Sequence, residues 1–137
     1  MYRVVVPVDN DEARSRRQAE FVATLPEAPD EVEVYLTHVL RGEELTAPKA
    51  MRNPGRVKTV RDAKEYLEAE GITVNIAEAG LPPEEGIIDL AEDVGADMIV
   101  MGGRKRSPSG KALFGSVTQS VILDADCSVV VTGKGGD

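Results

Sequence analysis

The sequence has no tryptophan, a single cysteine, and only 4% aromatic residues among its 137 positions. Because Cys127 stands alone, an internal disulfide is excluded. Because aromatic residues are so scarce, the core must be built from Val, Ile, Leu and Ala. Hydrophobic residues make up 42% of the chain, which is enough for a core without disulfides or metal. This composition is typical of a parallel sheet buried beneath helices.

Long apolar runs and an excess of basic residues are also missing. No run approaches the roughly 20 residues of a membrane-spanning helix, so we expect no membrane partner. The net charge is −8, with 24 acidic and 16 basic residues. Such a surface repels phosphate backbones, so we expect no nucleic-acid partner either. A strand pattern begins at residue 2 in place of a signal peptide, which predicts a cytoplasmic location.

Strand and helix patterns alternate along the chain, and we interpret residues 1–137 as one domain. Strands are predicted at 2–8, 31–40, 72–79, 97–101 and 128–132. Helices are predicted after Asp9-Asn10-Asp11, which supply N-cap chemistry, and at 56–70, 82–94 and 115–123. Residues 26–30 form a break, 41–55 a flexible loop and 133–137 a frayed tail. Strict alternation predicts a doubly wound α/β fold with a five-stranded parallel sheet and four helices.

The segment after the fourth predicted strand combines three features of an anion-binding site. Gly102 and Gly103 permit close backbone approach. Gly115-Ser116 begin a helix whose free amides and dipole favour an anion. Between them lie four cations, Arg104, Lys105, Arg106 and Lys111. Since ligands of doubly wound sheets bind at the carboxyl ends of strands, the sequence predicts an anionic ligand here.

These residues resemble the ATP-binding signature of the universal stress protein family, Gly-x2-Gly-x9-Gly-[Ser/Thr]. Gly102 takes the first place, and Gly115 and Ser116 take the last two. The opening run through Pro7-Val8-Asp9 is similar to the family's first strand, and residues 127–131 are similar to its last. The resemblance covers nearly the whole chain.

The resemblance implies an adenine-nucleotide alpha-hydrolase-like fold with strand order 3-2-1-4-5. It implies that ATP or another adenine nucleotide binds, with or without Mg²⁺, and that Asp9 and Val39 flank the adenine and ribose. The full set of nucleotide-binding residues that we predict is Pro7, Val8, Asp9, Val39, Met101, Gly102, Arg104, Lys105, Gly115, Ser116, Val117 and Thr118. It also implies a homodimer that pairs through the last strand, at Val129, Val130 and Val131.

One position departs from the signature, because Lys105 stands where its second glycine belongs. Its β-carbon would block a close backbone approach, or its ammonium would pair with a phosphate in place of the glycine. Both interpretations stay open at this point, although the surrounding cations favour retained anion binding.

Three functions are compatible with this interpretation of the sequence. The first is a regulatory stress-response protein that binds an adenine nucleotide and is not an enzyme. The second is a dimeric module of the same family that has lost the nucleotide and acts through protein contacts. The third is a nucleotide-chemistry enzyme on the same architecture. Such enzymes usually carry a Ser-Gly-Gly-x-Asp-Ser loop or a His-x-Gly-His pair, and we disfavour this function because neither motif occurs in the sequence. The single histidine, His38, lies in a predicted strand and is interpreted as structural.

Overall fold

The computed structural model describes residues 1–103 and 114–133. The strands are β1 (Tyr2–Val8), β2 (Val32–His38), β3 (Thr73–Ile76), β4 (Met98–Gly102) and β5 (Ser128–Thr132). The α-helices are α1 (Glu12–Ala23), α2 (Ala28–Glu31), α3 (Lys58–Ala69), α4 (Pro83–Val94) and α5 (Ser116–Asp124). Three short 3-10 helices, η1 (Gly42–Thr46), η2 (Lys49–Met51) and η3 (Pro54–Arg56), connect β2 to α3.

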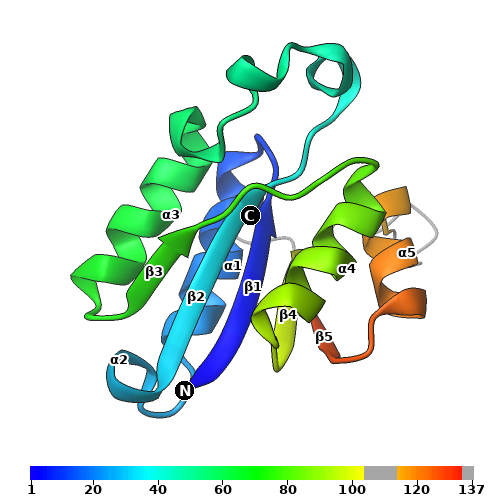
Figure 1. Ribbon diagram of the computed structural model, residues 1–137. Helices are drawn as coiled ribbons and strands as arrows, with labels where there is room; N and C mark the ends of the chain where they lie inside the picture. The colour runs from blue at the N-terminus through cyan, green and yellow to red at the C-terminus, as the bar shows by residue number, and fades with distance from the viewer. Residues whose placement is uncertain (104–113, 134–137) are drawn as a thin grey trace, which may run out of the picture.

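The five strands form one parallel sheet in the order β3-β2-β1-β4-β5, which confirms the predicted fold class and strand order (Figure 1). β1 is the central strand, between β2 and β4, and its residues from Val4 to Val8 are all buried. It pairs with β2 along its whole length, from Tyr2 opposite Val32 to Val8 opposite His38. β3 and β5 are the two edges.

Helices cover both faces of the sheet, and each face has its own core. Alternate β1 residues, Val4, Val6 and Val8, pack with side chains from α1 and α3. Val5 points to the other face, into a core with side chains from α4 and α5. A strand with both faces buried has no polar side to show, so β1 appears in the sequence as a continuous apolar run.

Two helices end at glycine in the left-handed region, as their sequences indicate. Gly71 after α3 has φ 82° and Gly95 after α4 has φ 65°. A side chain at this φ is strained, so glycine is the favoured terminator. None of the helices in the described ranges combines the length and apolar character that crossing a bilayer requires.

The structure differs from the sequence prediction in short elements. α2 forms where we predicted a break, which brings the described α-helices to five rather than four. A helix of one turn has no periodicity to detect. The segment predicted as a loop at 41–55 contains η1, η2 and the start of η3. β3 is four residues long, shorter than predicted, because its ladder to β2 extends only from Thr73 to Ile76.

Candidate functional site

The candidate site is the region where β1 and β4 end side by side, and we call this region the crevice. From β1 the chain moves outward to β2 and β3, and it then returns to β4 on the other side of β1. This reversal is the switch point at which doubly wound sheets bind ligands. Asp9 follows β1, Val39 follows β2 and Gly103 follows β4, so the three reach the same edge of the sheet (Figure 1).

Asp9 is buried, with 7% of its surface exposed, and its oxygens already accept hydrogen bonds from the protein. Oδ1 accepts from the amide of Asp11 at 2.9 Å, and Oδ2 accepts from Nη1 of Arg14 at 2.5 Å. The main-chain oxygen accepts from the hydroxyls of Thr59 at 2.6 Å and Ser15 at 3.3 Å. The N-cap of α1 is therefore Asp11, which accepts the amide of Arg14 at 2.8 Å, and not Asp9.

Arg14 spans the crevice from β1 to β4. While Nη1 holds Asp9, Nε donates to the carbonyl oxygen of Gly103 at 3.1 Å. Its stem covers Gly102, where an added β-carbon would overlap Cγ and Cδ of Arg14. A second guanidinium reaches the same carboxylate, since Nη2 of Arg41 lies 3.9 Å from Oδ2 of Asp9. Nε of Arg41 is shielded from water and has no acceptor among the described residues, so the crevice retains an unsatisfied donor.

Sequence reasoning missed Arg14 and its neighbour Gln18. Gln18 is 1% exposed, and its Nε2 donates to the carbonyls of Pro7 at 2.7 Å and Val100 at 2.9 Å, which ties β1 to β4. In the sequence both residues belong to a polar stretch that resembles a solvated helix face. Their separation of four positions, which places them on one face of α1, is the signal that could have found them.

His38 and Glu44 fasten η1 to the end of β1. The ring Nδ1 of His38 lies 3.0 Å from the carbonyl oxygen of Val8, and Nε2 lies 3.0 Å from Oε2 of Glu44. Both ring nitrogens thus have protein partners, which gives His38 a structural role. Burial acts to raise the pKa of Glu44, but hydrogen bonds from His38, the Arg41 amide and Asn10 outweigh it. The pKa of Glu44 is therefore lowered from its ordinary 4.5.

We expect the free energy of unfolding of Glu44→Gln to fall less than that of the wild type as the pH is lowered. A carboxylate with a lowered folded-state pKa stabilises the fold above pH 4.5, and that contribution disappears as the pH falls through the folded-state pKa. The side chain is 34% exposed, so screening keeps the effect under about 1 kcal/mol. Urea unfolding from neutral pH downward measures it, with the exposed neighbour Glu43→Gln as control. Parallel curves for the two variants would contradict the assignment.

The start of α5 has the features of an anion site. Its N-cap is Gly115, which offers no side-chain acceptor, and its first turn contains no acidic residue. Ser116 is exposed, whereas Val117 and Thr118 are buried. Because α5 leads back to the beginning of β5, its N-terminus lies at the edge where the strands end (Figure 1). The positive end of its dipole is available there for an anion.

The side chains of the other predicted site residues at the ends of β1, β2 and β4 are buried. Val39 and Met101 are buried in the core beneath α4 and α5, and Val8 is buried in the core beneath α1 and α3. Pro7 is buried as well, and its carbonyl is occupied by Gln18. These residues reach the edge of the sheet mainly through their backbone. Two predicted residues lie outside the described ranges, namely Arg104 and Lys105.

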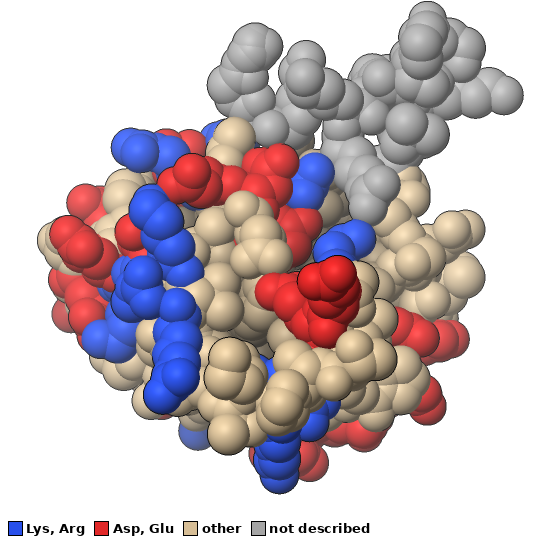
Figure 2. All heavy atoms as spheres, turned by 90° about the horizontal axis from the view of Figure 1, so that it is seen from above, with Lys and Arg blue, Asp and Glu red and all other residues tan. Residues whose placement is uncertain are grey.

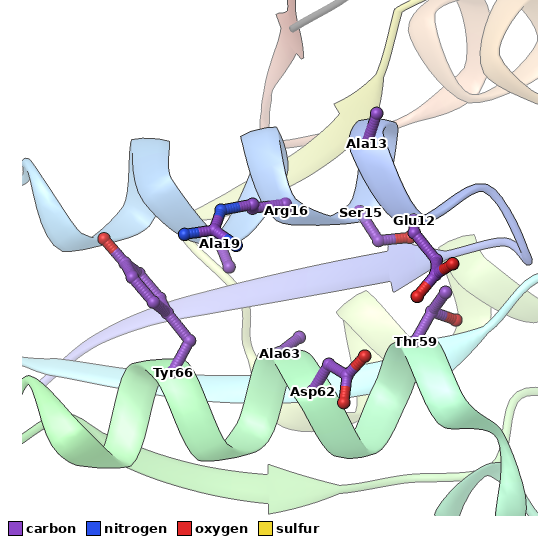
Figure 3. A pocket seen from close by; sticks show the side chains of 9 residues that line it. All are labelled: Glu12, Ala13, Ser15, Arg16, Ala19, Thr59, Asp62, Ala63 and Tyr66. Atoms are coloured by element: carbon purple, nitrogen blue, oxygen red, sulfur yellow. The ribbon is translucent and has the colours of Figure 1, made fainter. Parts of the chain in front are cut away.

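A separate hollow of about 430 Å³ lies between α1 and α3 (Figure 3). Ala19 and Ala63 leave room between the two helices, and Tyr66 lies toward one end (Figure 3). Ser15 and Thr59 line it as well, and their hydroxyls hold the main chain of Asp9. Ser15 and Thr59 therefore belong both to the lining of this hollow and to the contacts that fix the main chain of Asp9.

Comparison with known proteins places this arrangement in a family. The sequence model described as the universal stress protein family matches residues 1–133. The chain belongs to the universal stress protein family. The sheet order is accordingly that of the family's adenine-nucleotide alpha-hydrolase-like fold.

Individual family members are similar over different lengths. Universal stress protein MJ0577 of Methanocaldococcus jannaschii is 38% identical over 76 residues, which are 55% of this chain and 46% of that protein. This match spans about half of the relative's length. A universal stress protein structure from Archaeoglobus fulgidus has 34% identity and a TM-score of 0.77, covering 97% of this chain and 99% of that one. A second structure from Archaeoglobus fulgidus, in complex with dAMP, has 28% identity and a TM-score of 0.72, covering 97% and 98%.

Proposed function

We propose that this domain binds an adenine nucleotide, ATP or a related compound, in the crevice between β1 and β4. The observation that carries the proposal is the coincidence of the switch-point crevice with an uncapped helix start at the same edge of the sheet. The dAMP complex of a relative with 28% identity over nearly the whole chain supports the choice of an adenine nucleotide. The unsatisfied Nε of Arg41 suits an oxygen of such a ligand.

We further propose a regulatory role in stress response, in the cytoplasm, with little or no catalysis. Two candidate proton acceptors at the crevice, Asp9 and His38, already have protein partners. Asp9 accepts from Asp11 and Arg14, and His38 contacts Val8 and Glu44. A group held in this way is poorly placed to act as a general base. Nucleotide binding would then shift the population of conformations or assemblies.

The decisive experiment looks for the nucleotide directly. Protein purified without added nucleotide is denatured and its supernatant is analysed for adenine nucleotides by mass spectrometry, while calorimetry measures ATP binding with Mg²⁺ and with EDTA. We expect saturable binding of ATP. Absence of binding at millimolar ATP, in wild type and in Lys105→Gly alike, would reject the proposal.

A module that has lost its nucleotide is the second candidate, and Arg14 is the observation that favours it. Arg14 bridges Asp9 and Gly103 across the crevice, so a ligand there must displace or share this guanidinium. Arg14→Ala separates the candidates. If only this variant binds ATP, the arginine has closed the site in the natural chain. Equal binding by variant and wild type would show that Arg14 does not obstruct the ligand.

We also propose a homodimer that pairs through β5. This strand is an edge of the sheet, and Val129, Val130 and Val131 remain partly exposed in the single chain. An exposed apolar edge strand tends to pair with a strand of another chain. We expect light scattering at micromolar concentration to give a dimer mass, and Val130→Asp to give a monomer with a cooperative melting transition. Val130→Thr, which keeps the shape, should remain dimeric, and a monomeric wild type would exclude this interface.

A further inference from the structure

The stretch from the end of η1 into the first turn of α3 carries only positive charge. Residues 45–61 include no Asp or Glu, although the chain as a whole has a net charge of −8. The cations of this stretch lie in what we call the basic segment, residues 49–61, and they are Lys49, Arg52, Arg56, Lys58 and Arg61. The segment arches over the end of the sheet at the top of Figure 1. Figure 2 looks down on that end and shows Lys and Arg side chains gathered in a band along one side.

The basic segment also differs from the rest of the described surface in its ion pairing. Every Lys and Arg outside it in the described ranges forms an ion pair with a carboxylate, and these are Arg3, Arg14, Arg16, Arg17, Arg41 and Lys64. Within the segment Lys58 pairs with Glu12 and Asp62. The other four cations have no carboxylate partner among the described residues. This chain has more acidic than basic residues, so a group of cations without carboxylate partners is unexpected. Such a group is suited to bind an anionic surface of another molecule.

Exposed apolar side chains lie beside these cations. Met51, between Lys49 and Arg52 in the chain, is 66% exposed. Ile76, on the free edge strand β3, is 36% exposed. Lys49 and Ile76 line one open hollow of about 600 Å³, together with Ala50, Asn53, Pro54 and Glu78. A surface that offers cations and apolar contacts together fits a polypeptide better than a phosphate backbone, which has no apolar side chains to insert.

We propose that the basic segment and the adjoining hollow form a docking surface for an acidic segment of a partner protein. The partner's carboxylates pair with Lys49, Arg52 and Arg56, and an apolar side chain enters the hollow beside Ile76. This surface is independent of the nucleotide crevice, so it stands whether or not ATP binds. Nucleic acid and a second copy of this chain are the competing occupants that the experiment separates.

The test uses the whole protein and short fluorescein-labelled peptides followed by anisotropy. A peptide of glutamate and leucine is compared with its glutamate and serine counterpart and with labelled oligothymidine. We expect the glutamate-leucine peptide to bind most tightly, with an affinity that falls as NaCl is added. The combined variant Lys49→Gln, Arg52→Gln and Arg56→Gln should weaken this binding about tenfold or more.

The matched control is Arg16→Gln, Arg17→Gln and Lys64→Gln, which removes the same number of charges from paired sites on α1 and α3. It should bind the peptide like the wild type. Equal weakening in both variants, tighter binding of oligothymidine, or no saturable peptide binding would overturn the proposal. So would a wild-type oligomer that dissociates in the basic-segment variant, because a second copy would then be the occupant. Melting curves establish that both variants are folded.

Discussion

Replacing Gly86 with alanine is expected to destabilise the protein by roughly 2–3 kcal/mol, as overpacking of a tight contact does. Gly86 is buried in the first turns of α4, and the preceding loop crosses it closely. A β-carbon at Gly86 would overlap the carbonyl oxygen of Gly80 and lie 2.6 and 2.7 Å from Gly80 C and N. These are backbone atoms, so no side-chain rotation relieves the overlap, and the loop or the helix must move.

The sign of this effect is opposite to what helix propensity predicts. In an ordinary helix interior, glycine to alanine stabilises by about 1 kcal/mol. Gly80→Ala is the matched control, because a β-carbon at Gly80 has no heavy atom within 4 Å and its φ is not in the left-handed region. We expect that variant to stay within about 0.5 kcal/mol of wild type. Urea unfolding of both variants measures the difference, and a Gly86→Ala protein as stable as wild type would show that the contact is not close.

Gly86 also shows what sequence reasoning omits. The helix predicted at 82–94 is confirmed as α4, and its buried side chains, among them Ile87 and Ala91, repeat with the period of a helix. The reason for a glycine inside that helix is a loop that passes over it, and no local pattern encodes a tertiary approach. Similarly, the length of β3 depends on how far β2 remains beside it.

The crevice was predictable in its location and less so in its chemistry. Alternating strands and helices indicate the ends of β1 and β4, and Gly115-Ser116 indicates the start of α5. Arg14 could not be distinguished in this way from Arg16 and Arg17, because all three belong to one polar stretch. In the structure the latter two pair with Glu20 on the surface, whereas Arg14 turns inward to Asp9. The difference arises from the neighbouring β4, which only the fold brings near.

The crevice and the basic segment are connected through η1. Arg41 contacts the carboxylate of Asp9, and its amide donates to Glu44 at 2.9 Å. Glu44 in turn meets His38 at the end of β2. The chain continues from η1 directly into the basic segment. Arg41 and Glu44 therefore lie at the crevice, and the basic segment follows them along the chain.

Ser116→Asp is expected to weaken ATP binding about tenfold or more, which corresponds to about 1.4 kcal/mol, while slightly raising the melting temperature. Ser116 is the first residue of α5, behind a glycine cap without a side chain. A carboxylate there interacts favourably with the exposed amides and the helix dipole, which stabilises the free protein. The same carboxylate competes with the phosphates for those amides and repels their charge. One substitution thus moves stability and affinity in opposite directions.

Two controls make this result specific to phosphate at the start of α5. Gln119→Glu adds the same charge to an exposed position further along the helix and should leave ATP affinity nearly unchanged. Adenosine, which has no phosphate, should bind Ser116→Asp and wild type equally in calorimetry. If Ser116→Asp binds ATP like the wild type, or loses adenosine to the same degree, the phosphates do not lie at this helix start. The anion site would then have to be sought at Arg14 and Arg41, the guanidinium groups that already meet at Asp9.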